Sequence, residues 1–378
     1  MRIGIVTLPL HANYGGILQA YAMKTTLESL GHQATVFDQK NKTWFPQWWK
    51  APFIYAKRGV FRVLKGSAGP EVFKEYRIRR EFPVISSEIA PFVKEHISPR
   101  LLGGFSEIKS GEYDAFVVGS DQVWRPKYFP GRIEDAFLAF ADGQNVKRLS
   151  YAASFGTTDL EYDYTDLEQC SKLLSDFNAV SVRENSAVLM CSEWFDCEDA
   201  VHVLDPVLLL PRDRYSALAN GASHRPCKGK VLSYILDKSA SKTHIADLVA
   251  KWTSCQVHDA SVAPTDRSIP LSERVLPSIE EWLSCFEDAE FVVTDSFHGC
   301  VLSLIFHKPF LVIGNASRGL SRFQSLLEMA GLEERIVQGV DQDDDGEYWL
   351  QPLDWDAIDQ KLESFKAKSM EFLITALQ

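Results

Sequence analysis

The chain has 378 residues, of which 46% are hydrophobic and 24% are charged. This composition is ordinary for a soluble globular protein, and the chain is long for a single hydrophobic core, so we expect two domains. The formal net charge of −11 argues against general nucleic-acid binding, which needs a basic surface.

The N-terminal residues and the cysteines indicate the cellular compartment of the protein. A strand begins by Ile3, which leaves no room for a signal peptide, and no run of about 18 apolar residues is present to span a membrane. The seven cysteines form no CxxC pair, which favours reduced thiols over zinc or disulfide sites. We therefore expect a cytoplasmic protein.

Strands and helices are predicted to alternate along the chain. The first strand covers residues 3–7, a helix covers 17–30, and a second strand covers 34–38. Further strands are predicted at 115–118, 149–153, 179–182, 201–204, 231–236, 291–293 and 310–313, with helices at 184–191, 242–252, 278–286 and 354–377. Such alternation is typical of α/β proteins with parallel sheets.

An insertion at about residues 40–110 differs from the rest of the chain. Residues 40–80 carry eleven Lys or Arg against two Glu, a charge of +9, with aromatic residues between them. Basic and aromatic residues together favour an anionic membrane surface. The alternative is a helical insertion that covers the first sheet and keeps its lysines in solvent.

Proline and glycine mark a domain boundary. Residues 206–229 contain several of both and show little periodicity, which predicts a linker. We therefore predict an N-terminal Rossmann-like domain over residues 1–205, a C-terminal one over residues 230–350, and a cleft between them. Residues 351–378 form the final helical segment.

The segment TDSFHG provides the strongest candidate for catalysis, His298. It follows a predicted strand and enters a helix, and ligands bind at this end of the strands in open α/β sheets. Asp295, Ser296 and Gly299 flank the histidine, and backbone N–H groups at a helix start attract anions. An imidazole there can move a proton beside a bound phosphate or carboxylate. The alternative is a buried histidine bonded to a backbone carbonyl, and His307, at the end of this helix, is expected to be structural.

Two further loops follow predicted strands. The first, HANYGG, contains Asn13, Tyr14, Gly15 and Gly16, and its glycines allow a ligand to approach the backbone. The alternative is a tight turn, with Asn13 in an Asx turn.

The second loop contains Ser120 and Asp121, which either contact an acceptor hydroxyl or cap the next helix. Three arginines lie near strand ends: Arg183, Arg318 and Arg322. Guanidinium groups bind carboxylate or phosphate through paired hydrogen bonds, so these residues suggest a small polyanionic substrate.

Seven segments occur in an order that resembles the polysaccharide pyruvyl transferase family. They are GIVTLPLHANYGGILQAYA, DAFVVGSDQVW, LSYAASFG, VSVREN, LDPVLLL, SYILD and TDSFHGCVLSLIFHKPF, and they span about residues 1–335. The resemblance implies a fold like that of two-domain (GT-B-like) glycosyltransferases, with the acceptor on the first domain and the donor on the second. It also implies that the final helix packs back toward the first domain.

The resemblance further implies a reaction. Phosphoenolpyruvate donates a pyruvyl group to a sugar of a cell-surface polysaccharide or its lipid-linked precursor, and a cyclic ketal forms across two hydroxyls. His298 acts as general acid, while Arg183 and Arg318 hold the donor. The remaining candidates, from Asn13 to Arg322, contact the substrates. No metal or organic cofactor is expected.

One position departs from the family pattern, in which an arginine stands two residues before the catalytic histidine. Ser296 occupies that position here, so other groups must hold the donor's anion. Two alternatives remain. One is a glycosyltransferase that uses a nucleotide sugar, with Asp38 as a ribose contact. The other is a binding module that has lost its catalytic activity.

Overall fold

The computed structural model describes residues 1–39, 50–66, 70–314, 319–340 and 345–378. The first five-stranded sheet has the order β3-β2-β1-β4-β5 and contains β1 (Arg2–Val6), β2 (Gln33–Gln39), β3 (Arg100–Leu102), β4 (Ala115–Val118) and β5 (Lys147–Ser150). All of its strand pairs are parallel. Two short strands, β6 (Ser181–Val182) and β7 (Val201–His202), form a small parallel ribbon.

The second five-stranded sheet has the order β12-β11-β10-β8-β9 and is also parallel. Its strands are β8 (Lys230–Tyr234), β9 (Gln256–Asp259), β10 (Phe291–Thr294), β11 (Phe310–Ile313) and β12 (Ile336–Val337). Every residue of β4, β10 and β11 is buried, as expected for parallel strands with helices on both faces. The prediction of parallel sheets is confirmed.

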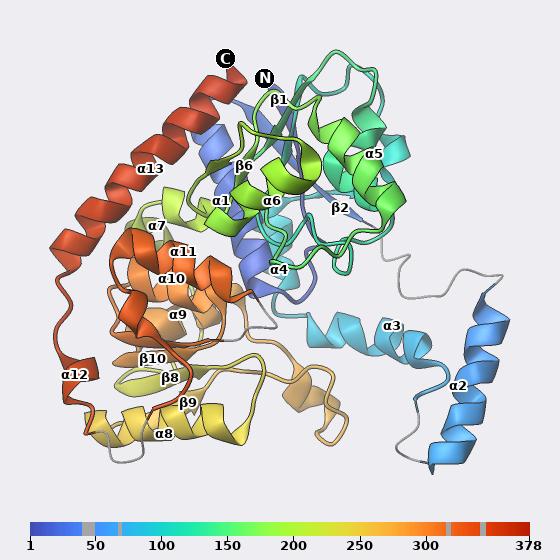
Figure 1. The fold of residues 1–378 in the computed structure, drawn as a ribbon. Helices are drawn as coiled ribbons and strands as arrows, with labels where there is room; N and C mark the ends of the chain where they lie inside the picture. Colours follow the sequence, from blue (N-terminus) through green and yellow to red (C-terminus); the bar gives the residue numbers. More distant parts are fainter. Residues whose placement is uncertain (40–49, 67–69, 315–318, 341–344) are drawn as a thin grey trace.

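Helices lie on both sides of the two sheets (Figure 1). They are α1 (Tyr14–Ser29), α2 (Ala51–Lys65), α3 (Lys74–Ile85), α4 (Ala90–Phe92), α5 (Tyr164–Leu174), α6 (Asn185–Phe195), α7 (Arg212–Ala219), α8 (Ala240–Thr253), α9 (Ile279–Asp288), α10 (Phe297–Ile305), α11 (Leu320–Ala330), α12 (Glu347–Leu350) and α13 (Trp355–Leu377). One apolar core cluster contains residues from β1 and α1 as well as from β8 and α10, so the two halves pack directly against each other.

Two connections between the halves are well packed. Residues 206–229, predicted as a linker, contain a short 3-10 turn and α7, whose Tyr215 is fully buried. Helix α13 runs from the second sheet toward the first, where the two termini lie close together (Figure 1). On α13, Ser369 accepts a 3.0 Å hydrogen bond from the backbone N–H of Leu204, and the ring of Phe372 lies 6.4 Å from that of Tyr151.

Helix α2 does not cover the first sheet, so the alternative predicted for the insertion is wrong for this part of it. Farther along the insertion, Ile89, Phe92 and Ile97 pack into the core with α1, and β3 joins the sheet. Helix α2 projects from the body and contains no buried residue (Figure 1). Its Arg58 pairs with Glu75 of α3 at 2.7 Å. Helix α3 in turn reaches the second half, where Glu81 accepts a 3.0 Å hydrogen bond from the buried Arg274. Among the described residues, no helix is both long and apolar enough to cross a membrane.

Candidate functional site

His298 lies in the first turn of α10, directly after β10. The predicted strand, turn, helix and second strand are all present as β10, α10 and β11. Ser296 caps the helix by accepting a 3.3 Å hydrogen bond from the N–H of Gly299, so the serine hydroxyl is used locally. The Nε2 atom of His298 is buried without a hydrogen-bond partner in the described structure, which argues against a histidine bonded to a backbone carbonyl.

The glycine loop of the first half packs directly on this imidazole. A Cβ atom added to Gly15 would lie 2.6 Å from Cε1 of His298 and closer still to Nδ1. At Gly16, an added Cβ atom would lie 2.8 Å from Nδ2 of Asn13. Gly15 therefore allows the start of α1 to approach the start of α10, whereas Gly16 leaves room for the side chains of Asn13 and Asp121. Two segments far apart in the sequence form one site in this way.

Gly15→Ala should displace the imidazole of His298, since the new methyl group would overlap the ring. We expect a loss of turnover and a destabilisation of about 1–3 kcal/mol, which is typical of overpacking. Turnover assays and urea denaturation measure both effects. Gly59→Ala is the matched control, because Gly59 lies within α2 with no atom near an added Cβ. A fully active Gly15→Ala protein would contradict the close packing.

Asn13 and Asp121 join the two loops of the first half. The side-chain amide of Asn13 donates a 2.8 Å hydrogen bond to Oδ2 of Asp121. The side-chain amide of Asn13 thus bonds to a residue that follows β4, and Asn13 makes no capping hydrogen bond to α1. Asp121 has a φ of 69°, and its neighbour Ser120 donates to Asp205. Neither residue caps a helix, so that alternative is wrong.

Asp205, which falls at the predicted end of the first domain and within the segment LDPVLLL, lies at the centre of the site. Its Oδ2 accepts 2.8 Å hydrogen bonds from Ser120 and from Arg183, and lies 3.7 Å from Nε2 of His298. Burial alone would raise the pKa of this carboxyl group, but His298 and Arg183 outweigh that effect and lower it. Asp205 is therefore ionised at neutral pH, with its carboxylate beside the imidazole.

Two of the three predicted arginines flank one aromatic ring. The guanidinium carbon of Arg183 lies 4.4 Å from the ring centroid of Phe297, and that of Arg322 lies 5.7 Å from it. Burial and the charge of Arg183 lower the pKa of Arg322 to about 10. Arg183 is buried against Asp205, whereas Arg322 reaches the cavity. Arg318 lies outside the described residues.

A cavity of about 200 Å³ opens beside His298. Its lining comes from both halves of the molecule: Leu8, Asn13, Asp121, Gln122, Tyr128, Leu236, Asp295, Ser296, Phe297, His298 and Arg322. A larger cavity of about 470 Å³ shares Asn13, Leu236 and Ser296 with it. Gln122 and Tyr128 were not identified from the sequence, because they lie in an irregular segment after β4, where no repeating pattern shows which side chains face the cavity.

Two predicted residues have partners within the protein. Asp295 accepts hydrogen bonds from the N–H groups of Leu236 and Asp237 and pairs with Lys242 at 2.6 Å, so its carboxylate fixes the loop after β8. Tyr14 donates a 2.7 Å hydrogen bond to the carbonyl of Pro277, and its ring lines the larger cavity. Both residues shape the walls of the site.

The fold and the site define an α/β protein with the predicted two-domain, GT-B-like architecture. A family model described as polysaccharide pyruvyl transferase matches residues 13–317. Because this match covers most of the chain, the protein belongs to the polysaccharide pyruvyl transferase family. The family implies a transferase of polysaccharide biosynthesis with a saccharide acceptor. No curated protein matches the chain.

Several solved structures are similar over nearly their whole length. The UDP-GlcNAc 2-epimerase from Neisseria meningitidis bound to UDP-GlcNAc is 12% identical, with 100% of this chain and 99% of that chain covered and a TM-score of 0.51. Arabidopsis thaliana UGT89C1 complexed with UDP-L-rhamnose is 10% identical, with 99% and 98% covered and a TM-score of 0.49. E. coli heptosyltransferase WaaC with ADP is 14% identical, with 97% and 100% covered and a TM-score of 0.38. The likeness to the epimerase shows the fold alone.

Proposed function

We propose that the protein transfers the pyruvyl group of phosphoenolpyruvate to a saccharide and forms a cyclic ketal across two hydroxyls. The observation that carries this proposal is the position of His298. It lies within the residues that match the family and lines a cavity that is also lined by Arg322. A proton donor beside a cation suits an anionic enol donor.

The reaction balances with His298 as the only proton carrier on the enzyme. The imidazolium gives its proton to C3 of the enol, and positive charge develops at C2. A sugar hydroxyl attacks C2 and its proton returns to the neutral imidazole. The bond from C2 to the phosphate oxygen breaks, the second hydroxyl attacks C2, and its proton leaves with inorganic phosphate. The negative charge of Asp205, 3.7 Å from Nε2, stabilises the imidazolium form of His298.

The donor's anionic groups need cationic partners, because Ser296 replaces the family arginine. Arg322 reaches the cavity, and the first N–H groups of α10 lie at its edge. Arg183 lies behind Phe297 and adds positive potential. We assign phosphate and carboxylate recognition to Arg322 and the helix start, with Arg318 as a further partner.

The acceptor is assigned to the larger cavity. Its lining includes Tyr14, Gly15, Tyr234 and Lys238, a mixture of aromatic and polar groups that suits a saccharide. It joins the smaller cavity at Asn13 and Ser296. A sugar placed there can present two hydroxyls toward His298.

Ligand-dependent stability distinguishes this proposal from a nucleotide-sugar transferase. A ligand at one hundred times its Kd adds about 2.7 kcal/mol to the stability of the folded state. We expect phosphoenolpyruvate to raise the Tm and uridine diphosphate to leave it unchanged. Asp38, the proposed ribose contact, lines a different cavity from His298. Stabilisation by uridine diphosphate alone would favour the glycosyltransferase, and donor binding without phosphate release would favour a binding module.

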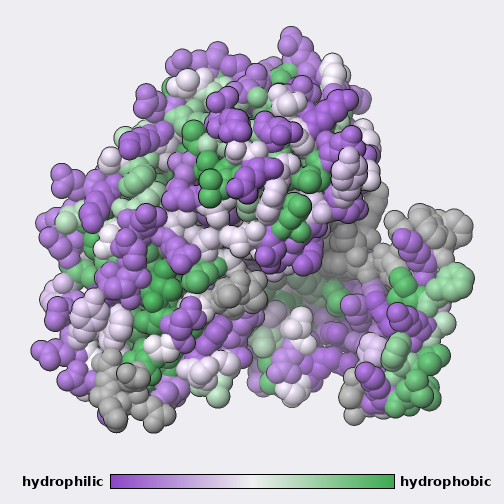
Figure 2. All heavy atoms as spheres, in the orientation of Figure 1, coloured by the Kyte–Doolittle hydropathy of each residue, from purple (hydrophilic) through white to green (hydrophobic). Residues whose placement is uncertain are grey.

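The exposed helix α2 supports a lipid-linked acceptor at the cytoplasmic face of a membrane. Phe53, Val60, Phe61 and Leu64 form one stripe along the helix, and Phe53 and Leu64 are 78% and 74% exposed. Figure 2 shows hydrophobic side chains on this projecting helix beside strongly polar ones. Such an arrangement is typical of helices that lie in the membrane interface.

Flotation with anionic liposomes tests this contact. We expect the protein to bind at low salt and to dissociate as salt is raised. Because burying each of two large apolar side chains contributes about 1.5–3 kcal/mol, Phe53→Ser with Leu64→Ser should weaken binding by about 100-fold or more. Tyr164→Ser is the control, since Tyr164 is equally exposed at the start of α5. No binding of the unaltered protein at low salt would end the proposal.

A further inference from the structure

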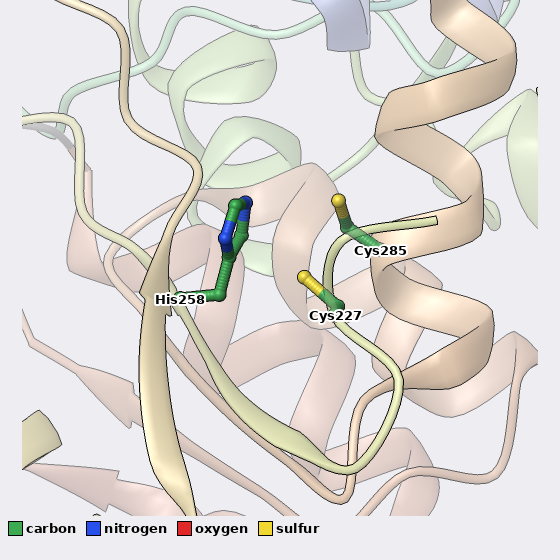
Figure 3. A group of neighbouring side chains, drawn as sticks. All are labelled: Cys227, His258 and Cys285. Carbon is green, nitrogen blue, oxygen red and sulfur yellow. The ribbon is translucent and has the colours of Figure 1, made fainter. Parts of the chain in front are cut away.

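Two cysteines and a histidine converge in the second half of the molecule. Cys227 lies in the loop before β8, His258 lies on β9, and Cys285 lies on α9. Their sulfur and ring nitrogen atoms all lie within 4.8 Å of one another. Figure 3 shows the three side chains approaching from these three segments. None of them belongs to the cavities beside His298.

The backbone around this cluster is well fixed. His258 pairs in register with Leu232 of β8, and the carbonyl of Cys227 accepts a 3.0 Å hydrogen bond from the N–H of Lys230 at the start of that strand. Both sulfur-bearing residues are buried, and His258 is half-buried at the outer strand of the sheet. The donor atoms are thus held together by the fold before any ligand is present.

We propose that Cys227, His258 and Cys285 bind a zinc ion. Two thiolates and an imidazole are a ligand set that zinc accepts, and soft sulfur donors disfavour magnesium and calcium. Zinc–sulfur bonds of about 2.3 Å at tetrahedral angles place two sulfurs about 3.8 Å apart. Small side-chain rotations bring atoms within 4.8 Å to that spacing. Zinc binding releases the thiol protons and involves no change of oxidation state.

Three protein ligands leave a fourth tetrahedral position. Glu281 lies one helical turn before Cys285 on α9 and interacts electrostatically with its thiol. Because the carboxylate of Glu281 is not within 4.8 Å of all three donor atoms, a water occupies this position in the proposed site.

A zinc ion here would support the acceptor cavity without taking part in chemistry. Trp282, one turn before Cys285, stacks on the ring of Tyr14 with centroids 4.8 Å apart. Fixing α9 to β9 and to the loop before β8 therefore fixes the wall against which Tyr14 rests. The proposal does not depend on the reaction at His298.

Metal content and cobalt substitution test the site. The full chain is purified under reducing conditions, stripped with a chelator, and titrated with Zn²⁺ alone. We expect one zinc per chain, and we expect Co²⁺ in its place to show thiolate-to-metal charge-transfer absorption. Cys285→Ser should weaken zinc binding by more than about 100-fold, beyond the effect of losing an outer hydrogen-bond partner.

Controls separate loss of a ligand from loss of folding. Cys197→Ser changes a half-buried cysteine of the first half and should bind zinc as the unaltered chain does. His258→Asn provides a second variant at a half-buried position, and circular dichroism of each metal-free variant confirms its fold. Absence of the charge-transfer band from the unaltered chain would overturn the proposal. Full zinc affinity in both Cys285→Ser and His258→Asn would also overturn it. A Cys227–Cys285 disulfide in the protein purified under reducing conditions would do the same.

Discussion

His298→Asn should lower kcat for pyruvyl transfer by about 100- to 10,000-fold, because a positioned general acid typically contributes that much. The asparagine retains a polar group near Asp205 but cannot deliver a proton to the enol carbon. Phosphate release from phosphoenolpyruvate in the presence of an acceptor measures kcat and KM. We expect KM for the donor to change little, since Arg322 and the start of α10 hold the anion.

His307→Asn is the matched control for this result. His307 ends the same helical region, has a φ of 52° that asparagine tolerates, and pairs with Asp359 at 3.1 Å. It lines a different cavity from the one beside His298. A fully active His298→Asn enzyme would remove His298 from the mechanism, and equal losses in both variants would indicate a folding effect.

Asp205→Ala should destabilise the protein by about 3–5 kcal/mol. Asp205 is 2% exposed and accepts a hydrogen bond from the fully buried Arg183, so its removal leaves this cation with only the longer 3.6 Å pair to Asp121. Urea denaturation measures the loss. Asp114→Ala is the control, because the exposed pair of Arg2 and Asp114 should contribute only about 0–1 kcal/mol. Equal stability of the two variants would contradict the account of the buried pair.

The pH dependence of stability provides a second measurement on Asp205. Its pKa is lowered in the folded state, so its stabilisation is complete above the unfolded value of about 3.9 and is lost as the pH falls below that value. Asp205→Asn removes this contribution. The difference in stability between the two proteins should therefore be largest near neutral pH and should narrow in acid.

The two parallel sheets could be predicted from the sequence because their strands are buried on both faces and therefore consist of apolar runs. Runs such as Phe291–Thr294 and Phe310–Ile313 read directly as strands. The prediction missed β3, β9 and β12, which are short or partly exposed and therefore lack a continuous apolar run. The strands predicted at 179–182 and 201–204 shorten to the two-residue β6 and β7.

The candidate site was predicted in part. The histidine, both glycines and Asn13 follow strands of the two sheets, and the carboxyl ends of those strands meet, so a rule about strand ends was enough to find them. Asp205 was missed because its role depends on contacts with residues far away in sequence. A carboxylate between the apolar runs VHVL and PVLLL was the available signal, since such a group needs buried partners.

The position of helix α2 and the Cys–His cluster also could not be predicted from local sequence patterns. Composition identified the insertion as basic and aromatic, but only the structure shows that α2 projects from the body and is joined to α3 through Glu75. Cys227, His258 and Cys285 have no short spacing that resembles a metal motif. Strand pairing of β8 with β9 and the placement of α9 bring them together.

Mass spectrometry of the acceptor tests the central claim most directly. The purified protein is incubated with phosphoenolpyruvate and a panel of saccharides that includes lipid-linked diphosphate precursors. We predict that one acceptor gains the mass of pyruvic acid less one water, that an equal amount of phosphate is released, and that mild acid reverses the modification. Absence of this product across the panel, together with consumption of a nucleotide sugar by the same protein, would contradict the proposed function.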